Sequence, residues 1–363
     1  MIKEKILIIH KGQFDNFPPL MSVKNGLNNI GYSVDVLTCN LITNKLFNTT
    51  ENVIVVRNLK KYSILSNLVW YFNFLSKLFS LLRNSTYKYI WIEGGDTLAL
   101  FGWIIKSKPN RIFQLSELYD KVPIYKYLIG KYIARFPKVV VPEINRAYII
   151  KTRYNLNELP FVLPNKPNYN IEKDFQIIDS NTNNVISNIL SFANDRKIIL
   201  YQGLISNDRK FDGIIDFVIE NRQNYCLVLL GKDTGYLSSI DVDKRAVYYA
   251  GFLLPPNHLH ITKIAWTCIM AYDTTSLNKV YCAPNKIWEY TKHKKPILSQ
   301  DLPGIKMLLS EYRIGVCCDV MNKNDVKRSI NEIENNYSEM SKNTEKFYDS
   351  IDVNSIIESI LRA

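Results

Sequence analysis

The sequence is poor in the residues that build metal centres and disulfide frameworks. Among 363 residues it has six cysteines and four histidines, and no two cysteines form a CxxC pair. Histidine pairs spaced as in HExxH are missing, and so is the GxxxxGK[ST] pattern of a P-loop. We therefore expect no metal site, free and mostly buried thiols, and no P-loop nucleotide site.

Long hydrophobic runs are also missing. No stretch reaches the roughly 18 uninterrupted apolar residues from which a membrane-spanning helix is inferred. The N-terminus passes directly into the apolar segment 5–10, without the basic region, long apolar region and small-residue cleavage site of a secretory signal. These absences predict a cytoplasmic protein without a transmembrane helix.

The formal net charge of +12 is unevenly distributed along the chain. Residues 1–165 hold 22 Lys and Arg against 10 Asp and Glu, whereas residues 166–363 hold 24 of each. A basic half attracts phosphate-rich partners, which are nucleic acid, an anionic membrane surface or a lipid-linked diphosphate. The alternative is a charge excess that only keeps the protein in solution.

A long helix rich in Trp, Tyr, Phe and Leu is expected over residues 62–83, with cations near both ends. Its apolar surface is wide for a single packed stripe. Two interpretations stand: insertion into an anionic membrane interface, or a core helix that packs on a sheet. Because its aromatic residues stand among leucines rather than arginines, we expect no nucleic-acid binding. We predict peripheral attachment to the inner face of the plasma membrane through the basic first half.

Short apolar segments alternate with helix-like segments throughout the chain, which is typical of βαβ units and parallel sheets covered on both faces. The fold class expected is α/β, with two Rossmann-like, doubly wound domains facing across a cleft. The first domain spans 1–165 and the second 166–345, and the helix in 346–363 is a candidate to cross back to the first domain. A polar, Asn-rich stretch at 179–188 is expected to begin a linker or a surface loop. The expected strands are 6–9, 32–37, 52–56, 89–92, 111–115, 138–141, 197–201, 225–230, 247–250, 267–272, 296–299 and 314–318.

Glycines follow three expected strands of the second half, at Gly203, Gly231 and Gly251. Parallel sheets bind ligands at these strand ends, and glycine lets the backbone approach a ligand closely. The loop after Gly203 ends in Arg209 and Lys210, which suit a phosphate and the charge of a departing diphosphate. The alternative is a solvated Arg-Lys pair. Further candidates for donor contact in these loops are Lys232 and Phe252.

The segment 283–290 reads as a helix that begins at Pro284. Asn285 and Lys286 fall in its first turn, where free N–H groups favour an anion. Glu289 lies three residues after Lys286 and therefore on the same face. A cation followed by a carboxylate one turn later can hold a nucleotide diphosphate and its ribose. The alternative is an ordinary amphipathic helix.

Polar loops also follow the expected strands of the first half. Asp96 is expected to cap a helix after two glycines that permit close backbone approach. Glu117, or Asp120 nearby, is a candidate to orient an acceptor hydroxyl, unless both are plain surface charges. The acceptor-side candidates are Gly12, Gln13, Gly94, Gly95, Asp96, Ser116 and Glu117.

The order of these motifs resembles glycosyltransferase family 4. The motifs are the Gly203 loop with Arg209-Lys210, Leu230-Gly231-Lys232, Tyr249-Ala250-Gly251, Pro284-Asn285-Lys286 with Glu289-Tyr290, Lys295-Pro296-Ile297, Asp301-Leu302-Pro303-Gly304 and Gly315-Val316. The resemblance is specific over residues 197–320 and thin over 1–165. It implies a retaining, metal-independent enzyme of the GT-B fold, of a kind that assembles bacterial O-antigen, capsule or exopolysaccharide.

The resemblance also implies roles for single residues. Glu289 corresponds to the last carboxylate of the family's E-x7-E motif and would bind the donor ribose. Arg209 and Lys210 would supply the cations for the diphosphate, and Asn285 and Lys286 would lie over it. Two positions depart from the family pattern: Tyr281 stands where the first acid of E-x7-E is expected, and Ser116, beside Glu117, stands where many members carry a histidine.

The sequence therefore predicts a glycosyltransferase without a cofactor that moves a sugar from a UDP- or GDP-sugar to a lipid-linked glycan acceptor. Two alternatives remain. One is a non-catalytic partner subunit of the same fold, which Tyr281 would favour, and the other is a sugar-nucleotide epimerase or hydrolase.

Overall fold

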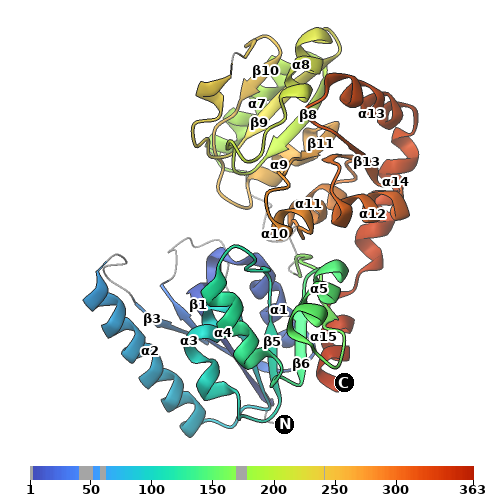
Figure 1. Cartoon of the computed structure of the whole chain (residues 1–363). Helices are drawn as coiled ribbons and strands as arrows, with labels where there is room; N and C mark the ends of the chain where they lie inside the picture. Colours follow the sequence, from blue (N-terminus) through green and yellow to red (C-terminus); the bar gives the residue numbers. More distant parts are fainter. Residues whose placement is uncertain (1–2, 41–51, 58–62, 169–177, 241) are drawn as a thin grey trace. The chain divides into compact units, whose positions relative to one another are not determined.

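A computed structural model describes residues 3–40, 52–57, 63–168, 178–240 and 242–363. The chain forms two compact units (Figure 1). The first unit contains residues 1–170 and 352–363, and the second contains residues 171–351.

The first unit is built on a parallel sheet with the strand order β3-β2-β1-β4-β5-β6-β7. Each strand is hydrogen-bonded to the next in this order, and β1 aligns Ile9 with Ile92 of β4. Alternate residues of β1 face opposite sides of the sheet, as the period of a strand requires. The strands are β1 Lys5–Gln13, β2 Ser33–Cys39, β3 Val53–Val56, β4 Tyr89–Glu93, β5 Arg111–Gln114, β6 Lys138–Val141 and β7 Phe161–Val162.

Helices cover both faces of this sheet. Leu7 and Ile9 belong to one hydrophobic cluster with residues of α2, α3, α4 and α5, whereas Ile6 and Ile8 belong to a second cluster with residues of α1 and α15. The helices are α1 Pro18–Asn29, α2 Ile64–Asn84, α3 Gly95–Ile105, α4 Pro123–Ile133, α5 Ile144–Tyr154 and α15 Val353–Arg362, with a short 3-10 turn at Phe14–Asn16.

The last helix, α15, is part of the first unit. Its Ile357 and Ile360 are buried in the second of the two clusters. The Leu361 carbonyl oxygen accepts hydrogen bonds from Tyr89 Oη at 2.8 Å and from Lys138 Nζ at 2.7 Å. The C-terminus thus packs on the first unit after the chain has passed through the second.

The second unit repeats the same topology. Its strand order is β10-β9-β8-β11-β12-β13, again parallel throughout. In both sheets the strand order reverses beside the first strand, between β1 and β4 and between β8 and β11, and ligands bind at such switch points in open α/β sheets. The strands are β8 Lys197–Gln202, β9 Tyr225–Leu230, β10 Val247–Tyr249, β11 Thr267–Met270, β12 Ile297–Gln300 and β13 Gly315–Cys318.

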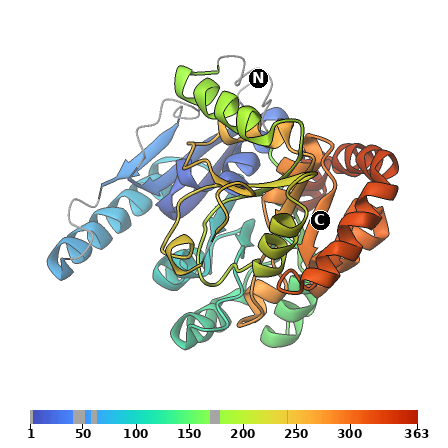
Figure 2. The same cartoon turned by 90° about the horizontal axis from the view of Figure 1, so that it is seen from above.

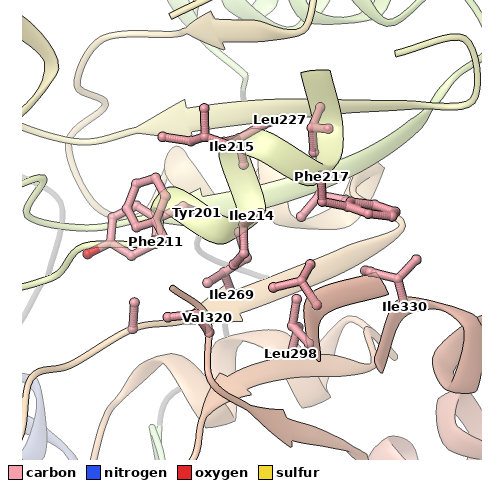
Figure 3. Close-up of a cluster of buried hydrophobic side chains, with 14 of the residues drawn as sticks. Tyr201, Phe211, Ile214, Ile215, Phe217, Leu227, Ile269, Leu298, Val320 and Ile330 are labelled. Carbon is pink, nitrogen blue, oxygen red and sulfur yellow. The ribbon is translucent and has the colours of Figure 1, made fainter. Parts of the chain in front are cut away.

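The core of the second unit lies on both faces of its sheet. Figure 3 shows one face, where Ile214 and Phe217 of α8 meet the strand residues Ile269 and Leu298 and also Ile330 of α13. α13 packs on α8, and α14 packs on α11. Figure 2 shows α13 and α14, in orange to red, from a second direction. The helices are α7 Ser180–Ala193, α8 Asp212–Glu220, α9 His258–Ile264, α10 Leu277–Val280, α11 Lys286–Lys292, α12 Pro303–Tyr312, α13 Lys323–Asn335 and α14 Tyr337–Ser350.

The predicted loop at 179–188 was wrong, because this stretch forms the start of α7. Asp179 caps the helix by accepting a hydrogen bond from the Thr182 N–H. Val185, Ile189 and Ala193 are spaced four residues apart and pack on the core. This narrow apolar stripe is enough to hold the helix on the sheet, although Asn-rich composition made the segment resemble a loop.

Two helix starts also differ from the prediction. The helix expected from Pro284 begins at Lys286, with Asn285 at its cap position. The cap of α3 is Gly94, with φ of 92°, and not Asp96, which lies within the first turn. Gly94 has a positive φ, a backbone conformation that residues other than glycine rarely adopt. This lets the chain turn from the end of β4 into α3 at one residue.

The long aromatic helix forms as expected, with only part of it packed on the sheet. Among the described residues of α2, Phe74 and Leu78 are buried, whereas Ile64, Leu65 and Phe72 are among its strongly exposed apolar side chains. Nowhere in the described ranges is a helix both long and apolar enough to span a bilayer.

Candidate functional site

The loops after β8 and β9 meet backbone to backbone beside the switch point of the second unit. Gly203 has φ of 123° and Gly231 has φ of 149°. A Cβ atom built on Gly231 would lie 1.7 Å from the Gly203 carbonyl oxygen, so no side chain fits there. The Gly203 N–H donates to the Leu230 carbonyl oxygen and the Gly231 N–H donates to that of Gly251. Three glycines predicted from the sequence therefore lie next to one another.

Lys286 lies against this glycine junction. Its Nζ atom is 4.5 Å from the centre of the Tyr201 ring and 5.8 Å from that of Tyr272. A Cβ atom on Gly203 would lie 2.7 Å from the same nitrogen. The nitrogen is buried and makes no hydrogen bond with the described residues. Burial, with a smaller contribution from Arg209, lowers the pKa of Lys286 to about 7.

Arg209 provides a second cation at this place. Its guanidinium lies 5.2 Å from the centre of the Tyr272 ring, and its Nη1 atom would be 4.0 Å from a Cβ on Gly203. Two cations that face one glycine repel each other, and an anion placed between them would relieve that repulsion. Lys210, predicted to act with Arg209, is exposed, and within the described ranges no hydrogen bond or ion pair joins it to this group.

Glu289, one turn after Lys286 on α11, is held from two sides. Gln202 Nε2 donates to Oε2 at 2.6 Å, and His258 Nε2 lies 3.4 Å from Oε1. Gln202 is fixed in turn by Thr262, whose hydroxyl donates to Gln202 Oε1 at 2.7 Å. Burial raises the pKa of Glu289, but His258, Lys286 and Gln202 outweigh it, and the pKa lies below its ordinary value. Glu289 is thus an oriented carboxylate with a side chain still 21% exposed.

A salt-bridged lysine fixes the loop that carries Arg209. Lys279 Nζ donates to Asp208 Oδ2 at 2.8 Å and to Asp273 Oδ2 at 2.7 Å. The Asp273 N–H also donates to the Asp208 carbonyl oxygen. The hydrogen bond from Lys279, with a further one from Ser206, lowers the pKa of Asp208 to about 2. The loops after β8 and β11 are therefore tied together next to Arg209.

The other donor-side candidates lie around this group. Gly251, with φ of 76°, precedes Phe252, whose side chain is 57% exposed. Lys232 is exposed, and its carbonyl oxygen accepts a hydrogen bond from Ile205. Tyr281 directly follows α10 as its C-cap. The Asn285 carbonyl oxygen accepts a hydrogen bond from the Trp288 N–H at the start of α11.

In the first unit, the acceptor-side candidates divide into two groups. Ser116 is buried and donates to Glu93 Oε1 at 2.9 Å, and Glu93 Oε2 lies 2.7 Å from His10 Nδ1. Gly12 belongs to this group, because a Cβ atom there would lie 2.5 Å from His10 Nε2. At the switch point of the first unit, Glu93 therefore lies between His10 and Ser116 and contacts both.

The second group consists of Gly94, Gly95, Asp96, Glu117 and Gln13. A Cβ atom on Gly95 would lie 2.5 Å from Ile129 Cδ1, so this glycine allows α3 and α4 to pack closely. Asp96 pairs with Lys11 at 3.0 Å. Glu117 is largely exposed and lies 4.0 Å from Arg146, and Gln13, at the end of β1, is exposed.

Residues of these groups that were not singled out from the sequence include His10, Gln202, His258 and Lys279. Several of their contacts join residues distant in sequence; Gln202 and Glu289, for example, are 87 residues apart. The available signal was position, since Gln202 is the last residue of the first strand of the second half and His10 directly follows the strand expected at 6–9.

Comparisons with known proteins bear on the fold. No family model matches the sequence, and no curated protein matches it. Anabaena Alr3699/HepE, solved with UDP and glucose, is similar in structure with a TM-score of 0.72 and 13% identity over 99% of this chain and 98% of that one.

Two further solved structures are similar over nearly the whole chain. Sucrose-phosphate synthase from Thermosynechococcus elongatus has a TM-score of 0.65 and 11% identity, covering 99% of this chain and 95% of its own. WaaG, a glycosyltransferase involved in lipopolysaccharide biosynthesis, has a TM-score of 0.64 and 12% identity, covering 98% of both chains. The chain has the GT-B fold, with two Rossmann-like α/β domains built on parallel sheets.

Proposed function

We propose that this protein is a glycosyltransferase that takes a sugar from a nucleoside-diphosphate sugar. One observation carries the proposal: the buried ammonium of Lys286, without a hydrogen-bond partner among the described residues, faces Gly203 together with Arg209. A buried charge without a partner is costly. A diphosphate would supply oxygens to both cations, and Gly203 has no side chain to stand between them.

Glu289 extends this site to the sugar part of a nucleotide. An ionised carboxylate accepts hydrogen bonds only, and each oxygen has room for two donors. Gln202 and His258 occupy one position on each oxygen. The remaining positions suit the two adjacent hydroxyls of a ribose, and Phe252, exposed after Gly251, suits contact with a base.

The nucleotide we propose is a uridine nucleotide. HepE has been solved with UDP and with UDP-glucose, and it shares the fold. A GDP-sugar is the alternative donor. We propose that the chemistry needs no cofactor, because Arg209 and Lys286 supply the positive charge that stabilises a departing diphosphate.

Titration calorimetry with UDP and GDP tests the donor site. We expect UDP to bind, and Arg209→Ala to weaken binding about 10- to 100-fold, because charge-assisted hydrogen bonds contribute roughly 1.5–3 kcal/mol. Lys263→Met, which removes an exposed lysine of the same unit, serves as the control. Absence of binding by the native protein for either nucleotide would refute the proposal.

Binding of UDP at pH 8 should take up close to one proton. With its pKa lowered to about 7, Lys286 is mostly neutral at pH 8, and a diphosphate beside it favours the charged form. The uptake should diminish towards pH 6, where Lys286 is already charged. It is measured by calorimetry in buffers of different ionisation enthalpy. Uptake that persisted in Lys286→Met would assign the proton to another group.

The acceptor that we propose is a lipid-linked glycan at an anionic membrane surface, as in bacterial surface polysaccharide assembly (O-antigen, capsule or exopolysaccharide). Exposed apolar side chains of α2 support this, with Ile64 80%, Leu65 72% and Phe72 63% exposed. The helix carries Lys77 and Arg83 and no acidic residue. A helix with this composition suits the inner leaflet, where the protein would lie as a peripheral protein.

Sedimentation with vesicles containing anionic lipid tests this part of the proposal. Leu65→Ser combined with Phe72→Ser should lower the partition constant at least about 10-fold, since each buried side chain contributes roughly 1.5–3 kcal/mol. Leu190→Ser, at a residue 49% exposed on α7, is the matched control. Binding should also fall as salt is added. Equal binding by the double variant would exclude α2 as the contact.

A panel of UDP-sugars offered with lipid-diphosphate-linked monosaccharides distinguishes the alternatives. A glycosyltransferase elongates the acceptor and releases UDP. An epimerase or a hydrolase converts the donor without an acceptor, and a non-catalytic subunit does neither.

A further inference from the structure

Two carboxylates of the second unit lie beside a cation of the proposed diphosphate site. Asp208 directly precedes Arg209 in the loop after β8, and Asp273 directly follows Tyr272, whose ring centre lies 5.2 Å from the Arg209 guanidinium. Left without a partner, both carboxylates would repel an anion at Arg209 and would attract the guanidinium to themselves. An anion site at this place therefore needs a group that neutralises them.

Lys279 of α10 lies between the two carboxylates. Its Nζ atom donates to Asp208 Oδ2 at 2.8 Å and to Asp273 Oδ2 at 2.7 Å. The backbone of the lysine is fixed as well, because the Ser276 side chain caps α10 by accepting a hydrogen bond from the Lys279 N–H. A single ammonium thus serves both aspartates from a defined position.

The other oxygen of each carboxylate also accepts hydrogen bonds. Asp208 Oδ1 accepts the Ser206 hydroxyl, and Asp273 Oδ1 accepts the Thr275 N–H at 2.9 Å. Burial raises the pKa of Asp273, but hydrogen bonds from Lys279 and Thr275 outweigh it, and the pKa lies below its ordinary value. Burial lowers the pKa of Lys279, but its hydrogen bonds to the aspartates outweigh burial and raise it. The aspartates are therefore neutralised by an opposite charge and not by a proton.

This pairing leaves the Arg209 guanidinium outside the ion pairs. Within the ranges that the structure describes, no ion pair joins Arg209 to Asp208 or Asp273, since both aspartates pair with Lys279. A guanidinium binds carboxylate and phosphate oxygens through the same kind of charge-assisted hydrogen bond, so the two compete for it. Lys279 removes the competitors, and it also leaves one net negative charge beside the site in place of two.

We propose that Lys279 is a positioning residue which, by holding Asp208 and Asp273, keeps Arg209 available to the diphosphate of the donor. This rests on the proposed function, because it assigns a role within the donor site. Lys279 acts through the aspartates and touches no reacting atom. The two carboxylates then oppose donor binding, and the ammonium cancels their effect.

Titration calorimetry with UDP tests the proposal through the sign of each effect. Lys279→Met should weaken UDP binding about 10-fold, because a unit charge is lost beside the site. Asp208→Asn should bind UDP at least as tightly as the native protein, since its amide oxygen still accepts from Lys279 while the negative charge is gone. Lys279→Met combined with Asp208→Asn should recover most of the lost affinity, because the pair of changes restores the native net charge.

Two further measurements separate this role from a structural one. In the Arg209→Ala background, Lys279→Met should change the Kd for UDP by less than about threefold, because an effect exerted through Arg209 disappears with it. Lys306→Met is the matched control: it removes a lysine of α12 that pairs with Asp301 at 2.7 Å, and it should bind UDP as the native protein does. Melting temperatures report the stability of every variant.

Unchanged UDP binding by Lys279→Met overturns the proposal, and so does a loss of affinity in Asp208→Asn or a double variant that recovers nothing. An undiminished effect of Lys279→Met in the Arg209→Ala background would also overturn it. Each of these outcomes leaves the proposed function in place, whereas absence of UDP binding by the native protein would refute that function itself. If Lys279→Met does not fold, Asp208→Asn and the double variant decide the question.

Discussion

Replacing Lys286 by methionine should weaken UDP binding about 100-fold and lower kcat by about a further 100-fold. The ground-state loss follows from removing a charge-assisted hydrogen bond in a buried site, which contributes roughly 1.5–3 kcal/mol. The loss in kcat follows because the departing diphosphate gains negative charge in the transition state, where a fixed cation stabilises it further.

The same substitution should leave the protein as stable as before or more stable. Burial lowers the pKa of Lys286 to about 7, whereas the unfolded chain keeps an ordinary lysine pKa. Between these two pKa values the unfolded state binds more protons than the folded state. The folded state is therefore destabilised at neutral pH, and its stability rises as the pH approaches the pKa of free lysine. Methionine removes the penalty and still packs on Tyr201.

Calorimetric Kd, steady-state kcat and the free energy of unfolding in urea measure the three effects together. Lys263→Met is the control for the loss of one positive charge. A variant that bound UDP normally would show that Lys286 serves the packing of Tyr201 and Tyr272 and not a ligand. A variant that lost activity together with stability would point to the same conclusion.

Replacing Glu289 by glutamine should lower kcat/KM about 10²- to 10³-fold while the fold is retained. The amide is nearly the same size as the carboxylate but has one acceptor atom in place of two. In the native protein Gln202 donates to one oxygen and His258 lies against the other. In the variant these two neighbours and the ribose hydroxyls would all depend on the single remaining acceptor oxygen. The ribose hydroxyls that we place there would lose their partner, and donor orientation would be lost with it.

Kinetics with the donor panel and the melting temperature test this prediction. Glu345→Gln, which breaks the exposed pair with Lys294 at 2.7 Å, is the matched control. Because the pKa of Glu289 lies below its ordinary value, the native carboxylate stays ionised at neutral pH, and the native activity should not depend on its titration there. Full activity of Glu289→Gln would require another group to bind the ribose.

The local pattern of the sequence was enough to predict most of the fold. A continuous apolar run such as residues 6–9 fills both faces of a parallel strand, because side chains of successive residues point to opposite sides. Gly203, Gly231 and Gly251 mark strand ends where the backbone adopts φ values that other residues rarely reach. Their places in the chain, with Lys286 and Glu289 one turn apart, were readable without any tertiary information.

Tertiary structure decided which side chains meet. His10 and Glu93 come together only because β1 and β4 are neighbours in the sheet, and Gln202 reaches Glu289 from a strand 87 residues away. Strand order also decided that Ser116 hydrogen-bonds to a carboxylate, and packing decided that Gly95 accommodates Ile129. Local propensity acts within a few residues, whereas these contacts depend on sheet topology and on the packing of helices around it. The sequence alone therefore determined the two parallel sheets and the glycine-lined strand ends, and only the folded chain determined the partners that give each charged group its chemistry.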